Sequence, residues 1–383
     1  MVDLSKVHSF GFPTNIRFGF GAVKELSAYL KSENLSRPLL VTDPVIATLD
    51  FFKRIKTDLE NAGLAVEVFS EIHKNPVKSD VLNGGDVFDA HKSDVVVGIG
   101  GGAALDVARC VVLRINHRED LFKYDDLIGG DKYVTNDVPH FVTIPTTSGT
   151  GSEVGRSAII SEDDTKKKRI LFHPKLLAKI VFADPGLTYE LPPFITAATG
   201  MDALTHNMES YLAKNYNPMC DGIALQGIKM IYRSIEAAVK QNDPESRAEM
   251  LAASIMGAVA FQKGLGVVHS LAHPLSTLLD MHHGLANAIM LPYGMQFNIE
   301  GFENLFADMA HAMNLKDKTG AAVVQALTEL NAKIGMPSKL SEQGVKAEHI
   351  EDLSDLAIAD FAHPSNPKPV SREDFRAIYE QAI

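Results

Sequence analysis

The chain has few cysteines, no long apolar run and no excess of positive charge, and each absence excludes a class of protein. Its two cysteines, Cys110 and Cys220, cannot form a disulfide framework or a cysteine-rich metal site. No apolar run approaches the length of a membrane span. The net charge of -11 argues against a nucleic-acid-binding surface, which needs clustered Lys and Arg.

The remaining composition is that of an ordinary globular protein. Of the 383 residues, 45% are hydrophobic and 22% are charged, and this length suffices for two domains. Residues 1–10 lack a basic region followed by an apolar one, so no signal peptide is predicted. We therefore expect a cytoplasmic enzyme without nucleic-acid or membrane partners. A small-molecule substrate and assembly as a homodimer or a higher homo-oligomer are further expectations, which do not follow from composition.

Strand and helix patterns alternate through the first half of the chain. Apolar runs in this half predict strands at residues 38–42, 65–69, 94–99 and 141–144. Such alternation is typical of a parallel sheet with helices on its faces. From Pro193 onward helical periodicity dominates and strand-like runs are scarce. The sequence therefore predicts an α/β domain at residues 1–188 and an all-helical domain at residues 189–383.

Four residues of the helical half could close around one divalent metal, namely Asp202, His206, His269 and His283. Asp202 and His206 are four positions apart, so a helix would place both side chains on one face. His269 and His283 are fourteen positions apart, close to four helical turns. Pro274 lies between them and predicts a local bend, so their spacing alone does not prove that they converge.

Each of these residues also has an ordinary structural role. An Asp and a His four apart are more often a surface or capping pair, and a single buried His is usually a core residue with its hydrogen bonds satisfied. The density of histidines favours metal binding, because four of the fourteen lie between positions 269 and 283. Nitrogen and carboxylate donors without a thiolate suit Fe(II), Zn(II), Mn(II) or Co(II).

Two polar turns follow predicted strands in the first half. Gly100, Gly101 and Gly102 lie between a strand and a helix, where backbone N–H groups and the helix dipole favour an anion. Residues 145–153 follow the next strand and carry several hydroxyl groups. Together these turns suit a ligand with phosphates, ribose and an amide. The glycines do not form the Gly-x-Gly-x-x-Gly fingerprint, and such a triplet is as often only a tight connection.

Asp43, at the end of the first clear strand, has two alternative roles. Its carboxylate could hold ribose hydroxyls and repel a 2′-phosphate, which would favour NAD over NADP. It could equally cap the helix that begins near Pro44.

The chain resembles the iron-containing, group III alcohol dehydrogenases along essentially its whole length. The matching pieces are Asn75-Pro76, the glycine triplet with Asp106, residues 145–153, residues 197–206, His269 to Pro274, and His283-Gly284 with Ala288, Leu291 and Pro292. The resemblance implies a Rossmann-like nucleotide-binding α/β domain, an all-helical domain as in dehydroquinate synthase-like folds, and a cleft between them.

Positions carried over from the family define an expected site. The metal ligands match Asp202, His206, His269 and His283, which selects His283 over His282, and the metal is expected to be Fe(II), with Zn(II) as the alternative. His273 matches a histidine near the metal and the nicotinamide. Cofactor contacts match Asp43, Asn75, Gly101, Gly102, Thr146, Thr147, Thr150 and Lys168. Ala103, a further expected cofactor-binding position, replaces the serine usual after the glycines, which removes one hydroxyl contact to the pyrophosphate.

We therefore predict a metal-dependent alcohol dehydrogenase that transfers a hydride between a primary alcohol or aldehyde and NAD. The metal would lower the pKa of the alcohol as a Lewis acid. His273 could pass the proton toward solvent or orient a metal ligand. A lyase of the dehydroquinate synthase type is the alternative from another enzyme class, and a non-enzymatic metal- or nucleotide-binding protein is a third possibility.

The substrate prediction depends on two cations. Arg156 follows the hydroxyl-rich loop, and Lys263 precedes the metal-ligand candidate His269 by six positions. If both line the pocket, they would favour a substrate with a remote carboxylate, such as the short ω-hydroxy acid 4-hydroxybutyrate or its semialdehyde. The alternative is that both cations are exposed or paired with acidic residues.

Overall fold

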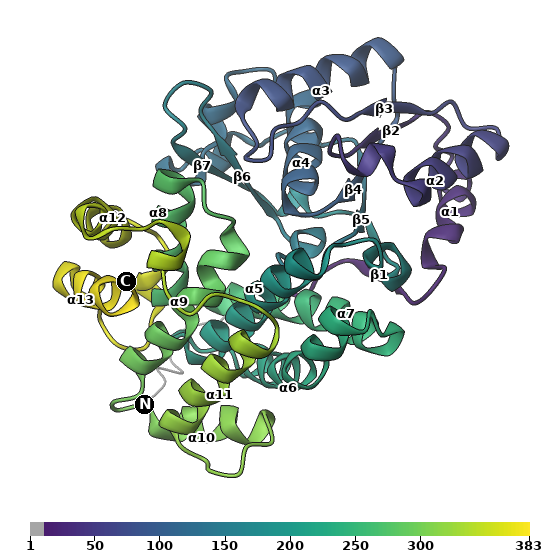
Figure 1. Cartoon of the computed structure of the whole chain (residues 1–383). Helices are drawn as coiled ribbons and strands as arrows, with labels where there is room; N and C mark the ends of the chain where they lie inside the picture. Colours follow the sequence, from purple (N-terminus) through teal and green to yellow (C-terminus); the bar gives the residue numbers. More distant parts are fainter. Residues whose placement is uncertain (1–10) are drawn as a thin grey trace. The chain divides into compact units, whose positions relative to one another are not determined.

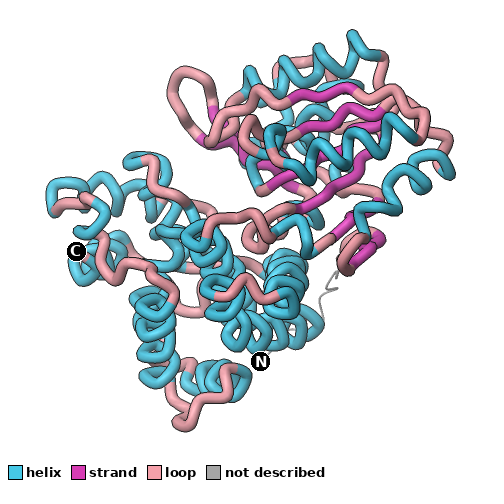
Figure 2. Tube along the Cα trace, turned by 45° about the vertical axis from the view of Figure 1, so that its right-hand side comes forward, coloured by secondary structure: helices cyan, strands magenta, loops and turns pink. Residues whose placement is uncertain are grey.

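The computed structural model describes residues 11–383, which form two compact units (Figure 1). The α/β unit comprises Pro13–Thr147 and Gly151–Tyr189, and the helical unit comprises Glu190–Ile383, Ser148–Thr150 and residues 11 and 12. Figure 2 shows the strands gathered in the α/β unit. The predicted fold class, an α/β domain followed by a helical one, is confirmed. Residues 1–10, for which no signal peptide is predicted, lie outside the described residues.

In the described part of the chain, six parallel strands form a sheet in the order β1-β8-β5-β4-β2-β3. The strands are β1 Asn15–Phe18, β2 Pro38–Val41, β3 Glu67–Phe69, β4 Val95–Gly100, β5 His140–Pro145 and β8 Ile180–Ala183. The four predicted strands correspond to β2, β3, β4 and β5. Two strands were not predicted from the sequence: β1, whose residues are mostly exposed, and β8, which is short and buried.

Helices cover both faces of this sheet. They are α1 Leu26–Ser32 and α2 Asp50–Asn61 on one face, and α3 Lys78–His91 and α4 Gly102–Asn116 on the other. Neighbouring residues of a strand point to opposite faces, so Leu40 of β2 packs with α1 and α2 while Leu39 packs with α3 and α4. Every residue of β2 and β4 is buried because helices cover both faces of the sheet.

A separate antiparallel hairpin follows the central strands. Its strands are β6 Ser157–Ser161 and β7 Lys168–Phe172, paired over their whole length. Arg169 of β7 forms ion pairs with Asp125 and Glu162, so its charge is balanced within the α/β unit. Lys168, a predicted cofactor contact, is the first residue of β7 and is half-buried.

The helical unit contains nine α-helices among its described residues. They are α5 Pro193–Leu212, α6 Pro218–Lys240, α7 Pro244–Ala260, α8 Val267–Leu279, α9 His283–Asn298, α10 Glu303–Ala312, α11 Gly320–Lys333, α12 Ile350–Ile358 and α13 Arg372–Ala382. Proline is the first residue of α5, α6 and α7, where its missing N–H would be unpaired in any case. Side chains before two of these prolines then cap the helices, Asn217 for α6 and Asp243 for α7.

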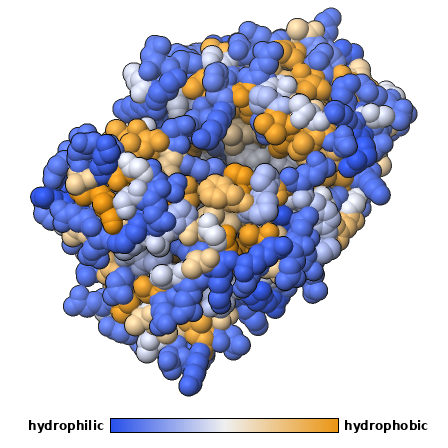
Figure 3. Space-filling model, in the orientation of Figure 1, coloured by the Kyte–Doolittle hydropathy of each residue, from blue (hydrophilic) through white to orange (hydrophobic). Residues whose placement is uncertain are grey.

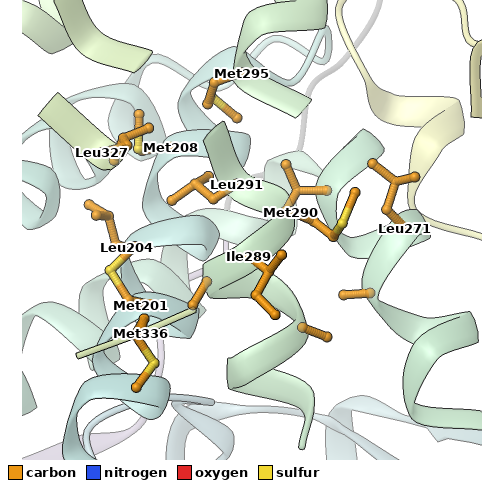
Figure 4. Close-up of a cluster of buried hydrophobic side chains, with 14 of the residues drawn as sticks. Met201, Leu204, Met208, Leu271, Ile289, Met290, Leu291, Met295, Leu327 and Met336 are labelled. Atoms are coloured by element: carbon orange, nitrogen blue, oxygen red, sulfur yellow. The ribbon is translucent and has the colours of Figure 1, made fainter. Parts of the chain in front are cut away.

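Helix α5 is the centre of this unit, and all its residues from Thr196 to Leu212 are buried. Figure 4 shows Met201, Leu204 and Met208 of α5 in one cluster with apolar side chains of α8, α9 and α11. A helix buried on all sides must find partners for every polar side chain it carries, because an unpaired buried polar group costs about 1–3 kcal/mol. The polar residues of α5 are therefore informative about function.

No single helix in the described residues is long and apolar enough to span a membrane, although α7 with its 3-10 extension and α8 pass that test as a pair bent by 107°. On the face shown in Figure 3, hydrophobic residues lie in small groups among hydrophilic ones. This pattern is usual for a folded protein, whose surface always retains some apolar area.

Candidate metal centre and cofactor edge

Asp202 and His206 lie on one face of α5, as their spacing predicts. Both are almost fully buried, with exposed fractions of 2% and 6%. The Oδ1 atom of Asp202 is 3.8 Å from Nε2 of His206. The side chains of Asp202 and His206 therefore point to the same place.

His269 and His283 belong to two different helices, and the chain turns between them at a place the sequence did not indicate. Pro274 lies inside α8 without ending it, so the turn between the two histidines does not lie at this proline. The helix continues to Leu279, and Asp280 then adopts a left-handed conformation with φ of 50°. His283 is the first residue of α9, so the turn at residues 280–282 brings it back toward His269.

The four predicted ligands converge on the carboxylate of Asp202. Its Oδ1 atom is 3.8 Å from Nε2 of His269 and 3.4 Å from Nε2 of His283. Donors about 2.0–2.2 Å from a shared ion would lie roughly 3–4 Å from one another. Ligand atoms of Asp202, His269 and His283 all fall within 4.8 Å of each other, and the ring of His206 stacks on that of His269 at 4.7 Å between centroids.

The electrostatics of this cluster match the forms that bind metals. Burial lowers the pKa of His269 and of His206, which favours the neutral imidazole form. Burial opposes ionisation of Asp202, but the neighbouring His206, His283 and His269 outweigh it and hold its pKa below the usual range. Among the described residues, the buried Nε2 of His269 has no hydrogen-bond partner. An unpaired buried nitrogen facing a carboxylate and two imidazoles fits a divalent ion such as Fe(II) or Zn(II).

Three supporting residues were not predicted from the sequence. Glu209 accepts a hydrogen bond of 2.6 Å from Nδ1 of His269, and the amide of Asn287 donates one of 2.7 Å to Asp202. Asp360 accepts one of 2.8 Å from Nδ1 of His273. Helical spacing could have indicated Glu209, three positions after His206, and Asn287, four after His283. Nothing in the sequence connects Asp360 with His273, because their separation is 87 positions.

His273 lies beside the ligand cluster and is not buried completely. Its ring stacks on that of His283 at 5.3 Å and on Phe361 at 5.3 Å between centroids. The side chain is 13% exposed. This position gives His273 contact both with a predicted ligand and with the surface of the helical unit.

In the α/β unit, the glycine turn and the following loop pack together at the carboxyl edge of the sheet. Gly100 of β4 is in register with Pro145 of β5, and its carbonyl accepts a hydrogen bond of 3.0 Å from the N–H of Thr146. A Cβ on Gly101 would come within 3.1 Å of the Thr147 methyl carbon, so a larger residue here would require the Thr147 side chain to shift. Helix α4 begins at Gly102 without a side-chain cap, which leaves its first N–H groups for an anion.

Asp43 has the capping role and faces the glycine turn as well. Its Oδ1 atom accepts hydrogen bonds of 2.9 Å from the N–H groups of Val45 and Ile46. Its Oδ2 atom lies 3.8 Å from the position that a Cβ on Gly100 would occupy. One oxygen caps the turn, and the other lies at the edge where a nucleotide would bind.

The remaining predicted cofactor positions are more dispersed. Ala103 is in the first turn of α4, Asn75 is exposed before α3, and Thr150 belongs to the helical unit.

A buried ion pair that the sequence did not predict fastens the loop after β5. Arg109, fully buried on α4, pairs with Asp106, and Asp106 also accepts a hydrogen bond of 2.7 Å from the Ser152 hydroxyl.

The two predicted substrate cations differ in their surroundings. Lys263 is only 7% exposed, and its ammonium group donates 2.5 and 2.8 Å hydrogen bonds to Asp221 and to the carbonyl of Tyr211. A buried ammonium needs such partners, so Lys263 has a structural role and its prediction as a substrate contact is wrong. Arg156 is half-buried, with its guanidinium 5.6 Å from the ring centre of Phe172.

A buried cluster of candidate metal ligands in one unit and a nucleotide-type sheet edge in the other are the features expected of a metal-dependent enzyme that binds a nucleotide. Comparisons with known proteins make this more specific. A model of iron-containing alcohol dehydrogenase matches residues 13–185, and a model of the Fe-containing alcohol dehydrogenase family, C-terminal, matches residues 196–383. The chain belongs to the iron-containing alcohol dehydrogenase family.

Individual relatives agree with this assignment. The chain is 38% identical to 4-hydroxybutyrate dehydrogenase of Cupriavidus necator, covering 97% of this chain and 98% of that one. A solved 1,3-propanediol oxidoreductase has a TM-score of 0.95 with 32% identity, covering 99% and 100%. Sulfoacetaldehyde reductase from Bifidobacterium kashiwanohense in complex with NAD+ has a TM-score of 0.89 with 25% identity, covering 98% and 99%.

The predicted enzyme class, an alcohol dehydrogenase acting on CH–OH groups, is therefore confirmed. Iron and NAD are supported as its cofactors. The lyase alternative is not favoured, because the relatives named above are dehydrogenases or reductases of alcohols and aldehydes.

Proposed function

We propose that Asp202, His206, His269 and His283 hold one Fe(II) ion, and that the protein oxidises primary alcohols with NAD and reduces aldehydes in reverse. The unpaired Nε2 of buried His269, facing Asp202 and His283, is the observation that carries this proposal. A divalent ion held there supplies Lewis-acid polarisation of an alcohol or carbonyl oxygen. Zn(II) fits the same donors and remains the alternative metal.

His273 is the proposed proton-transfer residue. Its Nδ1–H donates to Asp360, so Nε2 is the basic nitrogen of the ring. The partial exposure of His273 allows the proton released from the alcohol to reach solvent through this nitrogen. Asp360 itself is held by hydrogen bonds of 2.7 Å from the Ser270 hydroxyl and 2.9 Å from the N–H of Ala362, so the ring has one preferred orientation.

The carboxyl edge of the sheet is the proposed NAD site. Helix α4 offers its uncapped N-terminus to the pyrophosphate, and Oδ2 of Asp43 is available for ribose hydroxyls. The other proposed contacts are Asn75, Gly101, Gly102, Ala103, Thr146, Thr147, Thr150 and Lys168. The buried Thr146 hydroxyl has no hydrogen-bond partner among residues 11–383, which agrees with a polar ligand at this edge.

A short ω-hydroxy acid is the second candidate substrate. The 38% identity to a 4-hydroxybutyrate dehydrogenase supports it, and Arg156 is the cation proposed to bind the carboxylate. We also propose that the protein is a cytoplasmic homo-oligomer. Light scattering after size-exclusion chromatography measures its oligomeric state.

One assay tests the proposed activity and its substrate. Protein loaded with Fe(II) without oxygen, and separately with Zn(II), is mixed with NAD and an alcohol while absorbance at 340 nm is followed. We expect turnover of primary alcohols, and a higher kcat/KM for 4-hydroxybutyrate than for 1-butanol. No turnover with any alcohol refutes the activity, whereas equal kcat/KM for the two, or unchanged discrimination in Arg156→Ala, refutes only the acid-binding pocket.

A further inference from the structure

Helix α5 carries a second buried carboxyl side chain, Glu209, whose role lies outside the four-ligand set. Glu209 is one helical turn after His206 and is 2% exposed. Its Oε2 atom accepts a hydrogen bond of 2.6 Å from Nδ1 of His269, and its Oε1 atom accepts one of 2.6 Å from the N–H of Val268. One carboxylate therefore contacts both the ring of a predicted ligand and the backbone beside it.

The ring contact determines which nitrogen of His269 carries the proton. A carboxylate beside Nδ1 favours the tautomer with Nδ1–H, and the lone pair then lies on Nε2. Nε2 is the atom that lies 3.8 Å from Oδ1 of Asp202 and has no hydrogen-bond partner among the described residues. With the proton on Nε2 instead, His269 could not donate electrons to a metal at that place.

The backbone contact fixes where this ring is held. Helix α8 begins at Val267, and its N-cap residue Gly266 has no side chain to accept the first N–H groups. From another helix, Glu209 accepts the N–H groups of Val268 and His269, at 2.6 and 3.4 Å. A Cβ on Gly266 would come within 2.9 Å of Oε1 of Glu209, so the glycine makes room for the carboxylate.

A second pair on the same helix provides an internal comparison. His273, four residues after His269, donates its Nδ1–H to Asp360 in the same way. His273 is not in the ligand set, whereas His269 is. The two pairs therefore separate an effect on metal binding from a general effect of a carboxylate on an α8 histidine.

We propose that Glu209 is a positioning residue that holds His269 in its metal-binding tautomer and orientation, and so sets the affinity of the site for its metal. This inference rests on the ligand set proposed above. The carboxylate bound to Nδ1, the ring and the metal position form one line of contacts from α5 through α8 and back to Asp202 on α5.

Glu209→Gln tests the inference, because an amide keeps the shape and loses one acceptor. If its NH2 faces Nδ1, the imidazole must accept there and carry its proton on Nε2. The dissociation constant of Zn(II) is measured on the full-length loaded protein by competition with a chelator. We expect it to rise about 10- to 100-fold, the range found for partners of metal-binding histidines. Asp360→Asn is the matched control and should leave the Zn(II) dissociation constant unchanged.

The outcomes separate this inference from the ligand assignment. If His269→Ala keeps its zinc, the proposed ligand set itself is wrong. If His269→Ala loses zinc while folded Glu209→Gln binds it as tightly as the unmodified protein, only the role of Glu209 is refuted. Should Glu209→Gln not fold, nitrogen NMR of zinc-loaded protein with 15N-labelled histidine decides: a proton on Nδ1 of His269 supports the proposal, and its absence overturns it.

Discussion

The candidate functional groups of the two units differ in kind. At the carboxyl edge of the α/β sheet, the groups are backbone N–H atoms, glycines and hydroxyls that follow strands, such as Gly101 and Thr146. In the helical unit they are ionisable side chains on α5, α8 and α9, buried and paired with one another, such as Asp202 and His269. Backbone groups follow from the turn alone, whereas buried charges depend on every neighbour. Single substitutions should therefore be most damaging in the helical unit.

The largest effect is expected from removing a ligand of the helical unit. His269→Ala or His283→Ala should abolish most metal binding and lower activity by roughly 1,000-fold or more, because Lewis-acid stabilisation contributes several kcal/mol. Elemental analysis of purified protein measures the metal, and far-UV circular dichroism checks that both units stay folded. His282→Ala is the neighbouring control and should keep its metal. Full metal content in either ligand variant would show that the assignment is wrong.

A smaller effect, on turnover and not on metal binding, is expected for Asp360→Asn. Losing the carboxylate removes the partner that holds His273 with its basic nitrogen on Nε2. We expect kcat to fall by about 10²- to 10⁴-fold, the range of general acid–base catalysis, with KM little changed. The conservative Asp360→Glu should recover part of the rate. Equal losses of kcat in both variants, or a loss confined to KM, would argue against positioning of His273.

The next prediction concerns the α/β unit and its preference for NAD over NADP. Asp43→Gly should weaken the preference for NAD over NADP by about 10- to 100-fold, since hydrogen bonds to a charged group contribute about 1.5–3 kcal/mol. The ratio of kcat/KM for the two cofactors measures this change. The cap on Val45 and Ile46 is lost as well, so Asp43→Asn, which can still accept those hydrogen bonds, is the control for stability. An unmodified protein with equal kcat/KM for both cofactors would refute this role of Asp43.

The pair between Lys263 and Asp221 should matter for folding and not for substrate. Asp221→Ala leaves a buried ammonium with the Tyr211 carbonyl as its remaining partner. Since the Asp221 side chain is 34% exposed, we expect a loss of about 1–3 kcal/mol in the free energy of unfolding, below the cost for a fully buried pair. Urea unfolding measures it. A selective rise in KM for 4-hydroxybutyrate with unchanged stability would show that Lys263 contributes to substrate binding.

The smallest effect is expected at the surface of the α/β unit. A hydrogen bond from Arg118 holds the pKa of Asp89 below its usual range. Because this folded-state pKa lies below the unfolded value of about 3.9, the stabilisation is present above about pH 4. It is lost as the pH falls through the folded pKa. Arg118→Gln should therefore lower the free energy of unfolding at pH 7 by at most about 1 kcal/mol. Denaturant titrations at several pH values should show this difference vanish at low pH, and a difference that grows there would contradict the assignment.

Much of this comparison could be predicted from local sequence. Short apolar runs separated by helical segments predicted the buried strands β2, β4 and β5 and the edge strand β3. A strand covered on both faces must be apolar throughout. The i, i+4 spacing of Asp202 and His206 predicted their shared helix face. Resemblance to a known family then assigned the remaining ligand positions.

Other features depended on contacts between distant segments. The chain turns back at Asp280, where the left-handed residue allows α9 to return, and no local pattern in the sequence placed that turn. Lys263 looked available for a substrate, and only the fold placed Asp221 and Tyr211 around it.

Sequence alone therefore determined the order of the elements, the class of the two units and the residue types that can bind a metal, since these follow from periodicity and donor chemistry. Tertiary structure decided which charges are paired and which nitrogen of each histidine is available. Glu209 and Asp360 show why: each reaches its histidine across 60 and 87 positions, respectively. A tautomer depends on the group packed against the ring, and packing brings together residues that no local pattern connects.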